Sequence, residues 1–76
     1  MAKEIILYSK PGCAGCARVK EYFAANDITY SEKDVMKDRA ALADLMDRGF
    51  MSTPVTLIDG EAVVGFELDK FEMLLG

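Results

Sequence analysis

The feature that most constrains this chain is a short apolar run that stops abruptly and gives way to a helical pattern. Residues 4–9 are rich in β-branched and aromatic side chains, and they predict a strand buried on both faces of a sheet. A proline and a glycine then interrupt this run. From residue 13 to about 26 the apolar spacing becomes helical, with Cys16, Val19 and Phe23 on one face. The chain therefore begins as a strand, a turn and a helix.

The middle of the chain predicts one more strand and one more helix. Residues 28–34 favour a strand, and Asp38 is a typical N-cap for the helix that follows. Gly49 is placed to end that helix. The expected apolar face of this helix consists of Leu42, Leu45 and Met46.

The last third of the chain contains a hairpin signal. Residues 54–58 and 61–64 are apolar runs on either side of an Asp-Gly pair, which is typical of a two-residue turn. A final helix is expected over 68–75, buried through Leu68, Phe71 and Leu75.

The predicted order of elements is therefore β-α-β-α-β-β-α. The first two strands are joined through a helix, so they should be parallel by the right-handed crossover rule, whereas the hairpin adds an antiparallel pair. This order predicts an α/β fold with a four-stranded mixed sheet flanked by helices. We expect one domain that covers residues 1–76.

The composition argues against several classes of function. Nine basic and thirteen acidic side chains give a net charge of −4, which disfavours binding to nucleic acid. The chain has no histidine, which removes Cys-His and Ser-His nucleophile pairs and the commonest nitrogen ligand for zinc. No apolar run approaches the roughly 18 residues needed to span a bilayer, and the opening run is too short for a secretory signal. We expect a soluble, cytoplasmic monomer with no membrane partner and no bound cofactor.

The two cysteines, Cys13 and Cys16, carry the strongest chemical signal. A disulfide between them closes almost no loop, so it adds little stability and indicates redox chemistry instead. At the first turn of a helix, unpaired backbone N–H groups and the helix dipole stabilise a thiolate, so the pKa of Cys13 should lie below that of a free thiol. Lys10 precedes the pair by one turn and adds positive potential. On one helical face the two Cα atoms should be about 5–6 Å apart, which suits a disulfide.

Exposure should divide the roles of the two thiols. We expect Cys13 to attack a substrate disulfide and to form a mixed disulfide, which Cys16, buried one turn deeper, then resolves. The sequence shows no carboxylate that would accept the proton of Cys16.

A different class of function uses the same cysteines. Two thiolates suit Cu(I), and cysteines from two chains could complete a four-sulfur zinc or iron–sulfur site. The stretch Gly-Cys-Ala-Gly-Cys resembles the loops of small copper-chaperone domains. Those domains, however, have the order β-α-β-β-α-β, and they carry a methionine just before the motif. A soft-metal or iron–sulfur module therefore remains the alternative.

Three separated motifs resemble the small glutaredoxin-like redoxins of the thioredoxin superfamily. They are residues 8–16 with the two cysteines, Thr53-Pro54-Val55, and Gly65-Phe66 with Asp69. The YruB-type and NrdH redoxins are the most similar types. The resemblance implies a thioredoxin-like fold and thiol–disulfide oxidoreductase activity. It also implies that Thr53 and Pro54 form a cis-proline loop, whose backbone pairs with an extended substrate segment beside Cys13.

The resemblance leaves two reductants open. Glutathione-using glutaredoxins carry Gly-Gly and an acidic residue where this chain has Phe66 in place of the second glycine. They also carry Pro-Tyr between the cysteines, where this chain has Ala-Gly. These differences favour the NrdH type, which takes electrons from thioredoxin reductase, although Lys10, Thr53 and Asp69 match glutathione-contacting positions. The implied partners are disulfide-containing proteins, including ribonucleotide reductase, and either glutathione or a thioredoxin reductase. The expected substrate-binding residues are Lys10, Thr53, Pro54, Phe66 and Asp69.

Overall fold

Four strands form one mixed sheet in the order β2-β1-β3-β4. The structure is a computed structural model, and it describes residues 3–75. Strand β1 pairs with β2 in parallel and with β3 in antiparallel orientation, and β3 pairs with β4 in antiparallel orientation. The strands are β1 (Ile5–Ser9), β2 (Ser31–Asp34), β3 (Val55–Ile58) and β4 (Glu61–Val64). The predicted mixed sheet is confirmed.

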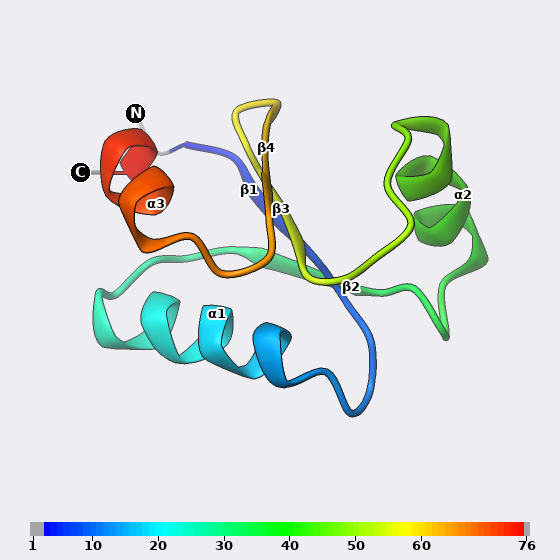
Figure 1. Ribbon diagram of the computed structural model, residues 1–76, viewed down its shortest axis with the longest axis horizontal. Helices are drawn as coiled ribbons and strands as arrows, with labels where there is room; N and C mark the ends of the chain where they lie inside the picture. Colours follow the sequence, from blue (N-terminus) through cyan, green and yellow to red (C-terminus); the bar gives the residue numbers. More distant parts are fainter. Residues whose placement is uncertain (1–2, 76) are drawn as a thin grey trace.

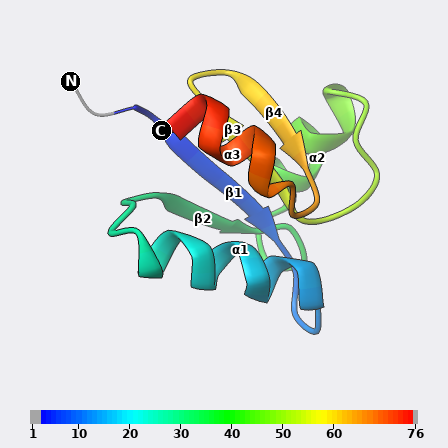
Figure 2. The same cartoon turned by 60° about the vertical axis from the view of Figure 1, so that its left-hand side comes forward.

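Three helices cover the two faces of this sheet (Figure 1). They are α1 (Ala14–Ala25), α2 (Arg39–Asp47) and α3 (Leu68–Leu75), so the predicted order β-α-β-α-β-β-α is also confirmed. Figure 2 shows α1 and α3 in front of the sheet and α2 behind it. No helix within residues 3–75 has the length and apolar character needed to cross a membrane.

The sheet separates two hydrophobic clusters, because successive side chains of a strand point to opposite faces. Along β1, Ile5 and Leu7 join the cluster beneath α1 and α3, whereas Tyr8 joins the cluster beneath α2. The first cluster comprises Ile5, Leu7, Val19, Phe23, Ile58, Val63 and Phe71. The second comprises Tyr8, Val35, Ala41, Leu45, Val55 and Leu57.

The predicted hairpin turn is present between β3 and β4. Asp59 and Gly60 have φ angles of 49° and 88°, the left-handed conformation that a two-residue turn of this kind requires. The turn also holds the start of β1. The backbone N–H of Glu4 donates to Asp59 Oδ1 at 2.8 Å, and the N–H of Asp59 donates to the Glu4 carbonyl at 2.9 Å.

Helix α2 is fixed by its cap and by a tyrosine from the sheet. Asp38 is the N-cap, as predicted, and its Oδ1 accepts from the Ala41 N–H at 3.1 Å. The Tyr8 hydroxyl donates to the carboxylate of Asp44 on α2. Burial and this hydrogen bond raise the pKa of Tyr8, and the same hydrogen bond lowers the pKa of Asp44. The helix is thus held against the end of β1.

The second strand begins later than predicted. Strand β2 starts at Ser31, because the preceding residues close the end of α1: the Ile28 N–H donates to the Phe23 carbonyl at 2.9 Å. Ile28 and Tyr30 still pack against the first hydrophobic cluster, but they do so from outside the strand.

Several side chains expected in the core are exposed instead. Helix α2 contacts the sheet through a narrow stripe of Ala41 and Leu45, so that Leu42 and Met46 lie on its flank and remain 37% and 54% exposed. Leu68 is also exposed, at the start of α3. Met36, Met51 and Met73 are exposed as well.

Candidate redox site

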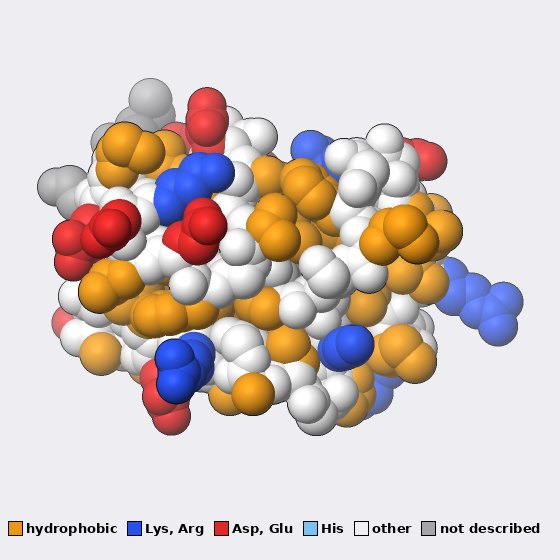
Figure 3. Space-filling view, in the orientation of Figure 1, with side chains coloured by type: hydrophobic (Ala, Val, Ile, Leu, Met, Phe, Trp, Pro, Cys, Tyr) orange, Lys and Arg blue, Asp and Glu red, His pale blue; other side chains and the backbone are white. Residues whose placement is uncertain are grey.

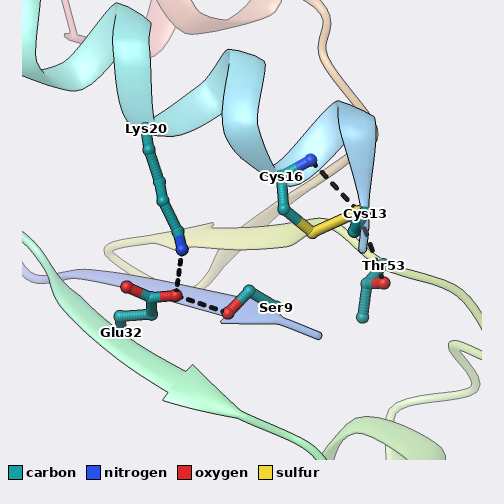
Figure 4. Close-up of a disulfide and its surroundings, with 6 residues drawn as sticks. All are labelled: Ser9, Cys13, Cys16, Lys20, Glu32 and Thr53. Atoms are coloured by element: carbon teal, nitrogen blue, oxygen red, sulfur yellow. Dashed lines mark hydrogen bonds and ion pairs between the residues drawn. A yellow bond between two sulfur atoms is a disulfide. The ribbon is translucent and has the colours of Figure 1, made fainter. Parts of the chain in front are cut away.

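Cys13 and Cys16 form a disulfide where β1 leads into α1 (Figure 4). Cys13 is the N-cap of α1, and its Sγ accepts a hydrogen bond from the Cys16 N–H at 3.1 Å. The two Cα atoms are 5.2 Å apart, within the range predicted from helical spacing. The Cys13 sulfur therefore occupies the position at which a helix start stabilises negative charge.

The two sulfur-bearing residues differ in exposure. Cys16 is 2% exposed and lies on the same face of α1 as Val19 and Phe23, whereas Cys13 is only half-buried. An external disulfide can therefore reach Cys13 more readily than Cys16. This asymmetry is what a nucleophile and a resolving thiol require.

The loop before β3 lies directly against the disulfide. The Thr53–Pro54 peptide bond is cis, as the resemblance implies, and the Thr53 hydroxyl donates to Cys13 Sγ at 3.7 Å. Pro54 is buried, and a Cβ atom at Gly15 would lie only 3.0 Å from Pro54 Cδ. Glycine between the cysteines thus permits the close approach of α1 to this loop.

Lys10 is the next of the predicted residues at this site. It is exposed, and it borders a shallow hollow together with both cysteines and Lys20. Lys10 also lines a groove between α2 and the loop before β3, and Thr53 lines the same groove. Lys10 and Thr53 are therefore the residues that join the disulfide to that groove.

Phe66 and Asp69 do not line this hollow, although the N–H of Gly65, just before Phe66, donates to the Pro54 carbonyl at 2.8 Å. Phe66 packs edge-on against Tyr22, with ring centroids 6.0 Å apart, and it lines a separate surface depression between α1 and α3. Asp69 is exposed in the first turn of α3. Phe66 thus follows directly on a residue bonded to the cis-proline loop, whereas Asp69 has no observed contact with the cysteine pair.

Sequence reasoning missed a polar network beneath α1. Glu32 Oε2 on β2 lies 2.6 Å from Lys20 Nζ and accepts from Ser9 Oγ at 2.7 Å (Figure 4). Hydrogen bonds from Lys20 and Ser9 lower the pKa of Glu32, and the bond to Glu32 raises the pKa of Lys20. The spacing of four residues between Cys16 and Lys20 is a signal that could have placed this lysine on the face of the buried thiol.

The alternative of a soft-metal site needs side chains that can act as metal ligands beside the two cysteines. Within residues 3–75, no group of three or more His, Cys, Asp or Glu side chains could hold a metal ion. A site built on Cys13 and Cys16 would need ligands from a second chain or from another molecule.

Comparison with known proteins places this geometry in a family. Residues 5–63 match the family model described as Glutaredoxin. A glutaredoxin-like protein from the rubredoxin operon of Clostridium pasteurianum is 36% identical, over 87% of this chain and 93% of its own length. The glutaredoxin-like protein NrdH of Lactococcus lactis subsp. cremoris is 27% identical, over 92% of this chain and 97% of its own length. The crystal structure of the thioredoxin-like protein BC3987 superimposes with a TM-score of 0.89 and 44% identity, covering 95% of this chain and all of that one. The chain therefore belongs to the glutaredoxin family of thiol–disulfide oxidoreductases, within the thioredoxin superfamily.

Proposed function

We propose that this protein reduces disulfide bonds in other proteins, with Cys13 as the nucleophile and Cys16 as the resolving thiol. The observation that carries the proposal is the half-buried Cys13 sulfur, which caps α1 beside a fully buried partner. A helix start stabilises the thiolate, and burial of the second sulfur keeps it from reacting with outside disulfides first.

The proposed reaction has two exchange steps. The Cys13 thiolate attacks one sulfur of the substrate, forms a mixed disulfide and releases the other substrate sulfur as a thiolate, which takes a proton from water. Cys16 loses its proton and attacks the Cys13 sulfur, so that the second substrate sulfur leaves and is protonated in turn. The protein ends in the disulfide form that the structure holds, and two electrons from a reductant restore the dithiol.

A methionine-lined groove supports a protein as the substrate. The groove runs between α2 and the loop before β3, and its apolar lining includes Met36, Met46 and Met51. In Figure 3, hydrophobic side chains are exposed on the right-hand part of the molecule, where Figure 1 shows α2. Since Lys10 and Thr53 border both the groove and the disulfide, we propose that the groove holds an apolar side chain next to the substrate cysteine.

Replacing Met51 with glutamate tests this use of the groove. We expect kcat/KM for a protein disulfide to fall about tenfold, because a carboxylate disfavours burial of an apolar side chain. The rate with bis(2-hydroxyethyl) disulfide, which is too small to fill the groove, should not change. Met51 is 89% exposed, so the fold should tolerate the change.

Met73→Glu is the matched control, since Met73 is 74% exposed on α3, far from this groove. It should leave both rates unchanged. Equal losses with the large and the small substrate in Met51→Glu, or no loss with either, would contradict the role of the groove.

The reductant forms part of the proposal. We infer that a thioredoxin reductase supplies the electrons, because Phe66 stands where glutathione-using relatives have glycine. Lys10, Thr53 and Pro54 are assigned to positioning the substrate, and Phe66 and Asp69 to contacts with the reductase. Ribonucleotide reductase as a substrate, a monomeric state and a cytoplasmic location stay predictions.

Insulin reduction with NADPH tests the activity and the reductant together. One reaction contains thioredoxin reductase, and the other contains glutathione with glutathione reductase. We expect strong turnover in the first, whereas turnover only in the second would reverse the choice of reductant. If neither reaction turns over and anaerobically purified protein carries stoichiometric copper, zinc or iron, the metal-binding alternative is correct.

A further inference from the structure

A charged pair lies one helical turn beyond the buried thiol. Lys20 follows Cys16 by four residues, so both side chains leave α1 on the same face. Figure 4 shows Lys20 extending on the side of Cys16 toward the strands beneath, where its Nζ is 2.6 Å from Glu32 Oε2. Lys20 also borders the hollow that contains both cysteines. The ammonium therefore lies on the side of α1 that carries the buried sulfur.

The position of Glu32 is fixed by the sheet. Glu32 is in register with Leu7 on β1, and Leu7 faces α1, so the carboxylate lies on the α1 side of the sheet. Ser9, which is 2% exposed, donates to the same carboxylate oxygen at 2.7 Å. The pKa of Glu32 is lowered by both donors and that of Lys20 is raised by Glu32, so both groups are charged at neutral pH.

Resolution of the mixed disulfide requires a negative charge to form in this region. Cys16 must become a thiolate before it can attack, and its burial opposes the charged form. A nearby positive charge reduces this penalty, whereas a nearby negative charge increases it. Lys10 lines the hollow in addition to Lys20. Tyr30 and Asp34 also face Lys20, and their charges raise the pKa of Lys20 further.

Resting on the dithiol function proposed above, we propose that Lys20 and Glu32 are positioning residues that set the reactivity of Cys16 in opposite directions. The Lys20 ammonium favours the Cys16 thiolate as it forms. Glu32, itself held by Ser9, keeps the ammonium against β2 and offsets part of its charge. The pair thereby adjusts how fast the mixed disulfide is resolved.

A purely structural role predicts a different result. The ion pair joins α1 to the edge strand β2, and removal of either partner breaks the same contact. Since the two side chains are 41% and 37% exposed, solvent screens this contact and it adds little to the stability of the fold. If the contact were only structural, Lys20→Met and Glu32→Gln would therefore have the same effect on the reactivity of Cys16. An electrostatic role instead gives the two variants effects of opposite sign.

The first measurement is the titration of Cys16 as the only thiol, in a Cys13→Ser background, followed by thiolate absorbance. We expect Lys20→Met to raise the pKa of Cys16 and Glu32→Gln to lower it. Lys20→Arg keeps the charge and should restore the wild-type titration. Lys70→Met and Glu61→Gln remove the same kinds of charge from α3 and β4, and they should leave the titration unchanged.

The second measurement is the rate of resolution at pH 7 in the full dithiol protein. A tenfold change in the thiolate fraction is partly offset by the opposite change in nucleophilicity, which leaves about a threefold change in rate. We therefore expect resolution to be about threefold slower in Lys20→Met and up to about threefold faster in Glu32→Gln.

Shifts of equal sign in the two variants, or no shift in either, would overturn this inference. The Cys16 titration does not depend on turnover of a protein substrate. If the opposite shifts occur but wild-type protein fails to reduce insulin, the proposed function is wrong and the electrostatic role of the pair stands. If wild-type protein reduces insulin and the shifts do not occur, only the role of the pair is wrong.

Discussion

Replacing Cys13 with serine should lower the rate of insulin reduction by about a thousandfold or more, since a serine hydroxyl is not ionised at neutral pH and cannot attack a disulfide. The Cys13 sulfur caps α1 and is the more accessible of the two, so we expect the buried Cys16 sulfur to replace it poorly. The turbidity of reduced insulin, followed with excess reductant, measures the loss.

Cys16→Ser is the complementary variant, and its expected defect is different. The first exchange still takes place, but the mixed disulfide between Cys13 and the substrate has no resolving thiol and should accumulate. Mass spectrometry of the unreduced mixture would detect the adduct. An adduct formed by the Cys13→Ser protein, with none in Cys16→Ser, would reverse the two roles.

Replacing Phe23 with alanine should have the largest effect on stability. The side chain is fully buried in the cluster beneath α1 and α3, with its ring centroid 4.9 Å from that of Tyr30 and 5.5 Å from that of Phe71. Truncation of a buried phenylalanine costs about 3–5 kcal/mol, and a small domain is stable by only about 5–15 kcal/mol. We expect the midpoint of urea unfolding to fall sharply, with part of the protein unfolded at 37 °C.

Leu68→Ala is the control for this effect. Leu68 is also apolar and lies on α3, but it is 42% exposed. Its free energy of unfolding should change by no more than about 0.5 kcal/mol. A similar loss in both variants would mean that the cluster around Phe23 is not the main source of stability.

Local patterns were sufficient to predict the elements that determine the architecture. The hairpin follows from Asp59 and Gly60, because few other residue pairs adopt the backbone conformation that the turn needs. The cap at Asp38 follows from one side chain and the helix start beside it. The placement of the cysteine pair required only the change from strand to helical spacing. Each of these features depends on residues that are close together in the sequence.

Features that depend on tertiary packing were not predictable in the same way. The network of Ser9, Lys20 and Glu32 joins side chains from β1, α1 and β2, and nothing in the sequence around Glu32 distinguishes it from a solvent-exposed charge. The exposure of Met46 depends on how narrow a stripe of α2 touches the sheet. Helical spacing gives the direction of an apolar face, but it does not give the width of the contact.

The sheet lies between the helix that carries the disulfide and the helix that borders the methionine-lined groove. Substitutions in one layer can therefore accumulate with little effect on the packing of the other. The groove surface can therefore change without altering the packing around the disulfide. On the proposed role of the groove, grafting a different α2 surface onto this scaffold should change which protein disulfides are reduced.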